Sequence, residues 1–410
     1  MTIFTRKATA AAIAALAAAT VGLAPAVTAA DKRMSKKAAF PPLAPLVPVP
    51  VPADNPMSAE KVELGKMLFW DSRLGGDASS PCVVCHEPGK GWGDGGEISR
   101  GYPGTQHWRN SQTVLNSAYY NKIFWEGSVT SLEAQAPSAA EGNVAGNGDP
   151  SLMEMRLRFI PEYVARFKKV FGTDWPRMFN AYQAIAAFER TIVSDARQVP
   201  FDRYMAGDKK ALSENAQRGM ALYNGKAGCI QCHNGPLASD QKFYSLGVPE
   251  NEVFKTDPLY QITHRWEHYQ KGVSEKDYRN ADKDLGLYYI TKNPKDVGKF
   301  RTPSLRELKY TAPYMHNGIL YTLDEVVDFY NKGGGEANWP NKTPLLKPLG
   351  LTDQEKKDLV GFLESLSMDK PLLMDPPKLP PYQPMKVREN EVSVKANAGS
   401  PALSAAAGAK

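Results

Sequence analysis

Apolar side chains recur at helical spacing in four segments of the chain, and strand-like alternation is rare. The segments 57–71, 174–195, 213–225 and 351–366 repeat apolar residues every three or four positions, which predicts an α-helix in each of them. Long stretches rich in Gly and Asn, such as 142–150, favour loops. The pattern predicts a mainly α fold with long loops and little strand.

Polar residues mark where three of these helices begin. Ser58 and Ser213 stand at the N-cap positions of the first and third predicted helices. Thr352 and Glu355 have the spacing of a capping box at the start of the fourth. The first and third helices each lead into a cysteine-containing motif, so the chain repeats its organisation.

The two ends of the chain differ in composition from the rest. Residues 1–30 combine the positive charges of Arg6 and Lys7 with an Ala-rich apolar stretch and small residues before position 30, as in a cleavable export signal. We therefore expect a periplasmic protein, without a membrane span because no later segment has ~18 uninterrupted apolar residues. Residues 31–56 predict a Pro-rich strap, and residues 369–410 a tail that is Pro-rich and then disordered.

Size and charge narrow the class of protein. The chain has 410 residues, of which 42% are hydrophobic and 23% charged, so it can bury more than one core. We expect two domains, over 57–200 and 201–368. The formal net charge of +6 is spread without a basic block, which is not the pattern of a nucleic-acid-binding protein.

Four cysteines are the whole cysteine content, and all of them belong to two CxxCH motifs. A zinc site would need two close cysteine pairs in one module, whereas these pairs lie far apart and each has its own His. A redox CxxC would not require the following His. Covalent attachment of haem c explains every position, since the sulfurs bind the vinyl groups and the imidazole binds iron. The predicted haem-binding residues are Cys82, Cys85 and His86, and Cys229, Cys232 and His233.

Motifs along most of the chain resemble those of bacterial di-haem cytochrome c peroxidases and the related MauG-type proteins. They include RNSQTVLN, FWEGSVTSLEAQ, FRTPSLREL and TAPYMHNGILYTLDEVVDFYNKGG. The resemblance implies two c-type cytochrome domains packed together, each with one covalent haem. The N-terminal haem would meet peroxide and the C-terminal haem would receive electrons. Trp125, in FWEG, would lie between the two haems. Without the resemblance, we would interpret this Trp as an ordinary aromatic residue of the core.

The resemblance gives two positions for the sixth ligand of the C-terminal haem. One falls near Gly298, which cannot bind iron, and the other is TAPYMHNG, in which Met315 offers a thioether. We predict that His233 and Met315 bind this iron; the alternative is a Met that only fills apolar space. The neighbouring His316 is expected to have a supporting role.

Three alternatives stay open for the sixth position of the N-terminal haem. The iron is left open, or Tyr102 binds it at the position where switching peroxidases of this family have a His, or His107 binds it as the single imidazole of the loop. We favour an open or weakly capped iron, as in the MauG-type branch. The alternative role for His107 is a hydrogen bond to a propionate or to the backbone.

Cleavage of peroxide needs a side chain that moves a proton, and the family uses a Gln followed by a Glu. Gln135 matches the Gln. Ala145 stands where the Glu is expected, and the nearest acid is Glu141. We predict Gln135 and Glu141 as catalytic residues together with Trp125, against the alternative that Glu141 is a solvated loop acid.

Two further groups have the residue types of metal ligands. Asn110 matches a family residue that helps to bind a calcium ion between the domains, although such ions take ~6 to 8 oxygens. His264 and His268 have the i, i+4 spacing of a helical metal site, but no acidic motif accompanies them. We expect these two to lie on a solvated helix face or a partner surface.

These observations predict a function. We expect a di-haem c-type peroxidase that reduces hydrogen peroxide with electrons from a small cytochrome c or cupredoxin. One alternative is a MauG-like enzyme that oxidises side chains of a partner protein, and another is a non-catalytic di-haem electron carrier. Dimers occur in the family, so a homodimer is a further expectation.

Overall fold

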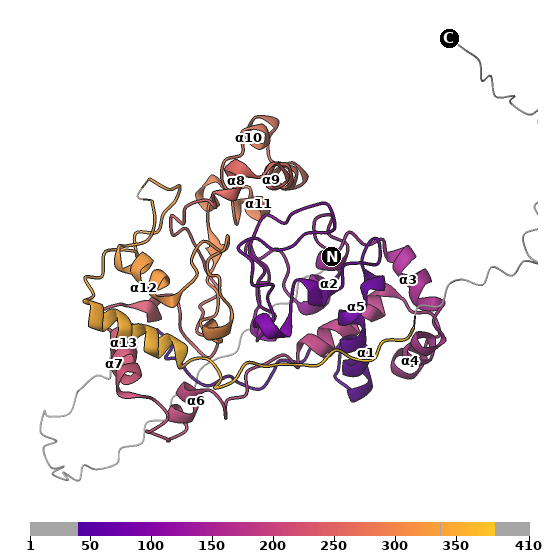
Figure 1. Ribbon diagram of the computed structural model, residues 1–410, viewed down its shortest axis with the longest axis horizontal. Coiled ribbons are helices and arrows are strands. Elements are labelled where there is room, and N and C mark those ends of the chain that lie inside the picture. The colour runs from indigo at the N-terminus through magenta and orange to yellow at the C-terminus, as the bar shows by residue number, and fades with distance from the viewer. Residues whose placement is uncertain (1–39, 337, 382–410) are drawn as a thin grey trace, which may run out of the picture. The chain divides into compact units, whose positions relative to one another are not determined.

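The computed structural model describes residues 40–336 and 338–381, and these are mainly helical (Figure 1). The predicted leader and the part of the predicted tail from residue 382 onward lie outside the described residues. The strands of the described part are β1 (Phe243–Tyr244) and β2 (Phe300–Arg301), which pair antiparallel with Phe243 opposite Arg301. The predicted mainly α class with little strand is confirmed.

Two helix pairs form the framework of the fold. Helix α1 (Ala59–Trp70) packs against α5 (Met178–Glu189), and α7 (Glu214–Asn224) packs against α13 (Asp353–Glu364). These are the four helices that the apolar periodicity predicts. No helix in the described part of the chain is both long and apolar enough to cross a membrane. The other α-helices are α2 (Leu132–Ala140), α3 (Pro150–Arg158), α4 (Pro161–Phe171), α6 (Pro200–Met205), α8 (Val253–Thr256), α9 (Pro258–Gln270), α10 (Glu275–Arg279), α11 (Tyr288–Thr291) and α12 (Leu323–Asn331).

Short 3₁₀-helices fill several of the connections. Two of them begin at a cysteine and therefore bear on the candidate site. The 3₁₀-helices are η1 (Ser72–Leu74), η2 (Cys82–Val84), η3 (Pro88–Lys90), η4 (Ser117–Tyr119), η5 (Cys229–Gln231), η6 (Pro294–Asp296) and η7 (Leu308–Tyr310).

The predicted helix caps agree with the structure in two of three cases. The hydroxyl of Ser58 accepts a hydrogen bond from the backbone N–H of Lys61 at 3.2 Å. Thr352 and Glu355 form the complete capping box at the start of α13. Ser213 stands at the N-cap of α7, but its hydroxyl donates to the side-chain carbonyl of the second residue of the helix at 2.5 Å and does not accept from a backbone N–H. The predicted start of α7 is therefore correct, but the predicted hydrogen bond from its cap is not formed.

A glycine stands where the two helices of each pair cross. A Cβ atom on Gly65 would lie 1.9 Å from the carbonyl oxygen of Ala184 in α5. A Cβ atom on Gly219 would lie 2.0 Å from the carbonyl oxygen of Asp358 in α13. Both crossings bring backbone against backbone, which only glycine permits. The internal repeat expected from the sequence is thus present in the packing of the helices.

Each helix pair contributes to its own cluster of buried apolar side chains. Phe69, Trp92 and Phe188 belong to the first cluster, and Phe201 and Phe362 belong to the second. All the described residues fall within one compact unit. The division into domains at residue 200 therefore stays a prediction.

The Pro-rich segments at either end of the described chain lie against the folded part. In residues 40–56, Leu43 is buried in the second cluster, and Asn55 forms hydrogen bonds with residues of α2 and α5. Residues 369–381 run back from α13 towards α1 and α4 (Figure 1). Along this run, the carbonyl of Leu372 accepts a hydrogen bond at 2.8 Å from an indole N–H of the first cluster. Both segments therefore connect the two clusters.

The expectation for His264 and His268 is wrong. Both lie on α9, but they are 0% and 1% exposed, because α8, α11 and the loop that carries Trp108 pack over this face of the helix. Neither ring nitrogen of His264 has a hydrogen-bond partner among the described residues. Burial, with a smaller contribution from the charge on His268, lowers the pKa of His264 to about 3. Helical spacing alone cannot show which segment will cover a helix face.

We expect the buried His264 to make the protein less stable in acid. Between pH 6.5 and 3 the unfolded chain binds a proton that the folded chain excludes, so stability falls as pH falls. The loss from pH 7 to pH 5 is about 2 kcal/mol for this group. Urea unfolding at the two pH values should give a smaller pH dependence in His264→Phe than in the parent. Trp266→Phe, on the exposed side of α9, is the control, and an equal pH dependence in all three proteins would contradict the prediction.

Candidate functional site

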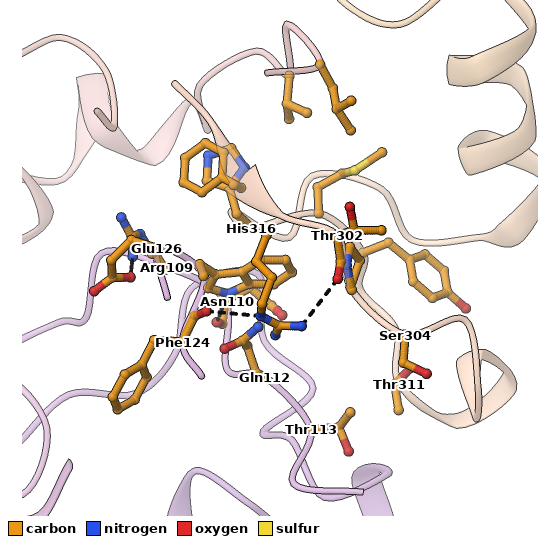
Figure 2. A pocket seen from close by; sticks show the side chains of 18 of the residues that line it. Arg109, Asn110, Gln112, Thr113, Phe124, Glu126, Thr302, Ser304, Thr311 and His316 are labelled. Atoms are coloured by element: carbon orange, nitrogen blue, oxygen red, sulfur yellow. Dashed lines mark hydrogen bonds and ion pairs between the residues drawn. The ribbon is translucent and has the colours of Figure 1, made fainter. Parts of the chain in front are cut away.

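One large cavity joins the two parts of the chain that carry the CxxCH motifs. Its volume is about 990 Å³, which is at the upper end of the range for ligand and cofactor sites. His86 and His233 both line it, together with cysteines of both motifs. Figure 2 shows Asn110 and Phe124 from the N-terminal half and Thr302 and His316 from the C-terminal half around one part of this space.

The two CxxCH motifs adopt the same local structure. The backbone N–H of His86 donates to the carbonyl of Cys82 at 3.1 Å, and that of His233 donates to the carbonyl of Cys229 at 2.9 Å. A single turn of 3₁₀-helix, η2 or η5, therefore brings two thiols and an imidazole together in each motif.

The thiols are not poised for thiolate chemistry. All four cysteines are free, with no disulfide between them. Burial raises the pKa of Cys82 and of Cys229 to about 12, so both stay protonated at neutral pH. A thiolate metal site or a thiol–disulfide redox pair needs the opposite shift. Among the described residues no group of three or more His, Cys, Asp or Glu side chains could hold a metal ion by itself.

The imidazoles of the two motifs are oriented in the same way. Nδ1 of His86 lies 3.2 Å from the carbonyl oxygen of Trp92, and Nδ1 of His233 lies 3.2 Å from that of Ala238. Burial lowers the pKa of both histidines, so the rings are neutral and can donate through Nδ1. This hydrogen bond leaves Nε2 to bind a metal. Two thiols and an oriented neutral imidazole beside a large cavity fit a covalently attached haem in each motif.

A second repeated turn distinguishes the two halves of the cavity. One turn contains Phe124 and precedes α2, the other contains Met315 and precedes α12, and each is closed by an isolated antiparallel bridge. Phe124 and Met315 occupy the same position in the turn, with φ of 64° and 74° respectively. Both side chains line the cavity. The place that holds a thioether in one half therefore holds a phenyl ring, which cannot bind iron, in the other.

The next residue in each turn also lines the cavity. Trp125 donates its indole N–H to the carbonyl of Asn110 at 3.0 Å. His316 stacks on Phe300 with 3.8 Å between ring centroids and meets the Trp125 ring edge-on at 6.4 Å. Burial lowers the pKa of His316 to about 4, so it is neutral. The two aromatic side chains thus face each other from opposite halves of the chain.

The predicted catalytic residues differ in whether they reach the cavity. Gln135 lines it, and its Oε1 has no hydrogen-bond partner among the described residues. Glu141 is not among the lining residues, and its carboxylate accepts a hydrogen bond from Tyr182 at 2.8 Å. In the structure, therefore, Glu141 does not reach the cavity in which its predicted catalytic role would be needed. Glu189, which the sequence analysis missed, does line the cavity.

The two loop residues predicted as possible ligands of the N-terminal haem also differ in whether they reach the cavity. His107 lines the cavity, and its Nδ1 accepts the backbone N–H of Arg109 at 3.1 Å. Burial, followed by the charge of Arg109, lowers the pKa of His107 to about 4. Tyr102 is not a lining residue. The side-chain amide of Asn110 donates to the carbonyl of Gly96 at 2.8 Å, and its predicted part in a calcium site stays a prediction.

A buried group of charges connects the two halves beside the cavity. Arg109 forms ion pairs with Glu126 and with Asp284, the latter at 2.6 Å, and all three side chains are buried. Figure 2 shows the contact between Arg109 and Glu126. Arg109 outweighs the effect of burial and holds the pKa of Asp284 below its ordinary value. The sequence gives no signal for this network, because its charged residues are far apart in the chain. Its one link to a predicted site residue is that Glu126 directly follows Trp125.

Comparison with known proteins decides the family. The sequence pattern of the di-haem cytochrome c peroxidases matches residues 59–210. The cytochrome-c peroxidase IdrP1 of Denitromonas iodatirespirans is 73% identical over 88% of this chain and 96% of its own length. The chain belongs to the di-haem cytochrome c peroxidase family. The predicted resemblance and the predicted peroxidase-like oxidoreductase class are therefore confirmed, and the family is defined by two haem groups.

Other members of the di-haem cytochrome c peroxidase family are more distant. The methylamine utilization protein MauG of Methylorubrum extorquens is 35% identical over 81% of this chain and 85% of its own length. The crystal structure of a MauG-like protein associated with microbial copper homeostasis is 31% identical, with a TM-score of 0.66 over 79% of this chain and 94% of that one. The fold is therefore shared with MauG-like proteins.

We expect the Arg109 network to be a large contributor to stability. Removing one partner of a buried ion pair leaves uncompensated charge, so Arg109→Ala should lower the free energy of unfolding by about 3–5 kcal/mol. Arg166→Ala is the matched control, because Arg166 forms an exposed i, i+4 pair with Glu162 worth about 0.3–0.5 kcal/mol. Chemical denaturation measures both, and similar losses in the two variants would contradict this account.

Proposed function

We propose that the protein is a periplasmic di-haem c-type peroxidase that reduces hydrogen peroxide with electrons from a small cytochrome c or cupredoxin. The observation that carries this proposal is the unequal pair of turns, with Phe124 in one half of the cavity and Met315 in the other. One half lacks a side-chain ligand at this position and the other offers one. An enzyme that must both bind an oxidant and receive electrons needs this difference.

Each CxxCH motif would hold one haem c. Cys82 and Cys85 would attach the first, with His86 on its iron. Cys229 and Cys232 would attach the second, with His233 and Met315 on its iron. When bound, haem supplies the redox chemistry and the site at which peroxide is cleaved. Support comes from the neutral, Nδ1-bonded imidazoles and the free thiols beside the cavity.

The residues of the chain then divide the remaining work. Gln135, whose Oε1 is unpartnered in the cavity wall, would orient peroxide. Trp125, held by the carbonyl of Asn110 and facing His316, would couple the two halves. Of the two loop candidates only His107 lines the cavity, and the proposal keeps the N-terminal site open or weakly capped. The thioether of Met315 favours a high potential, which suits the side that collects electrons.

Export, the electron donor, a calcium ion at Asn110 and a homodimer remain parts of the proposal that rest on sequence or resemblance. The predicted signal, residues 1–30, lies outside the described residues. Export is tested by finding the mature protein in the periplasm with its N-terminus near residue 31.

A MauG-like oxidation of side chains in a partner protein is the second candidate. The similarity to MauG and to a MauG-like structure supports it. The replacement of the family's acid by Ala145 also supports it, because a slower reaction with peroxide leaves time for another reductant.

Peroxide mixed with the haem-loaded protein separates the candidates. Fast turnover that requires a reduced cytochrome c supports the peroxidase, and oxidation that persists without such a donor supports the MauG-like reaction. Two low-spin haems that do not react with peroxide would indicate an electron carrier and contradict both.

Phe124→Met should convert the N-terminal site into a closed one. A thioether at this position can bind the iron, so the high-spin ferric signal should be replaced by a low-spin one. Reduction of peroxide should then slow by roughly tenfold or more, or ~1.4 kcal/mol of barrier. Electron paramagnetic resonance and stopped-flow absorbance measure the two effects. Phe124→Leu, which adds no ligand, should keep the high-spin signal. Unchanged spectra in Phe124→Met would show that this turn does not face the iron.

Glu141→Gln tests the acid that the sequence analysis predicts. Because its carboxylate is bonded to Tyr182 and does not line the cavity, we expect the variant to reduce peroxide at the parental rate. A rate lowered by the ~10²- to 10⁴-fold of a lost proton-transfer group would restore Glu141 to the mechanism.

A further inference from the structure

Glu189 is a buried acid with no function in the account above. It is the last residue of α5, it is 3% exposed, and it lines the cavity. Its Oε2 has no hydrogen-bond partner among the described residues. A buried carboxyl with a free oxygen costs stability unless it binds something or moves a proton, so its presence in the wall of a cofactor site needs an explanation.

The internal repeat gives Glu189 a counterpart. Where α1 and α5 cross, a Cβ on Gly65 would meet the side chain of Phe188, and where α7 and α13 cross, a Cβ on Gly219 would meet Phe362. The next residues along α5 and α13 are therefore equivalent. They are Glu189 and Leu363, and both line the cavity. A carboxyl group in one half thus replaces an apolar side chain in the other, which shows that packing alone does not require an acid here.

The surroundings keep this carboxyl protonated. Burial raises the pKa of Glu189 to about 8, against the opposing effect of Arg190 and with a further increase from Glu133. Arg190 is itself paired with Glu133 at 2.7 Å, and the charge on Glu133 offsets part of the effect of Arg190 on Glu189. On α1, Lys61 lies near this pair. A further titratable neighbour is the thiol of Cys82, which a thioether would make neutral.

We propose that Glu189 is a proton carrier of the N-terminal haem site, which releases its proton when that site is oxidised and regains it when the site is reduced. The inference rests on the proposed function. Reduction of peroxide needs two electrons and two protons for each two molecules of water formed. As the O–O bond of peroxide breaks, the O–H bond of Glu189 would break and its proton would pass to a peroxide oxygen. The second proton would come from solvent, and Glu189 would be reprotonated from solvent as the donor returns an electron. Oxidation adds positive charge at the site, and positive charge favours the ionised carboxylate. Oxidation is therefore coupled to release of the proton from Glu189.

The potential of each haem as a function of pH tests this proposal on the haem-loaded protein. In the parent, the potential of the N-terminal haem should fall as pH rises. The largest expected slope is about 59 mV per pH unit, which corresponds to a tenfold change in the one-electron reduction equilibrium constant per pH unit. Glu189→Gln should flatten this dependence. The potential of the C-terminal haem, beside Leu363, should depend much less on pH in both proteins.

Two further variants make the test specific. Glu307→Gln replaces another fully buried acid, which accepts hydrogen bonds from Ser194 and from a backbone N–H and does not line the cavity. It should keep the parental pH dependence. Leu363→Glu should introduce a pH dependence at the C-terminal haem. Loss of the dependence in Glu307→Gln as strongly as in Glu189→Gln would overturn the assignment.

Infrared difference spectra give a readout that does not depend on turnover. Oxidation of the parent should remove a carboxylic C=O band that is absent from Glu189→Gln, and persistence of that band in the variant would overturn the proposal. Failure of the proposed function is a separate outcome, because a protein that binds no haem or ignores peroxide would fail before any variant is compared. A protein that turns over peroxide with the same pH-dependent potential in Glu189→Gln would contradict this inference alone.

Discussion

The contact on which the rest of the structure depends is a helix crossing in which a glycine lets two backbones touch. It is made twice, by Gly65 against Ala184 and by Gly219 against Asp358. Each crossing fixes the helix that leads into a CxxCH motif, and that helix contacts the 3₁₀-helix of the motif. A side chain at either glycine would displace the helix carrying the motif, because the opposing atom is a backbone carbonyl that cannot move aside.

The same frame serves two chemistries because a few cavity positions differ between the halves. Phe124 corresponds to Met315 in the repeated turn, and Glu189 corresponds to Leu363 at the end of the repeated helix. One half therefore combines a non-ligating ring with a carboxyl group, and the other combines a thioether with an alkyl group. The repeated arrangement supplies the positions of the side chains, and the different residues at these positions give each half its electrostatic environment.

The two halves also have to stay in register for Trp125 and His316 to face each other. The backbone carbonyl of Trp125 accepts a hydrogen bond from the backbone N–H of Arg301 at 2.9 Å, which joins the first turn to β2 in the other half. The buried pairs of Arg109 add charge contacts across the same boundary. Burial of these charges makes the contacts sensitive to geometry, since a misaligned pair would leave an uncompensated charge in the interior.

The sequence by itself determined the features that depend on local chemistry. Helical periodicity located α1, α5, α7 and α13, and the CxxCH spacing identified both attachment motifs, because these patterns involve residues close together in the chain. Only the tertiary structure decided which side chains face the cavity. Glu141 was predicted from its distance along the chain, whereas Glu189 reaches the site through a helix packed from elsewhere. Burial of His264 was equally hidden, because Trp108, one of the residues that cover it, comes from a distant loop, and burial is a property of three-dimensional packing.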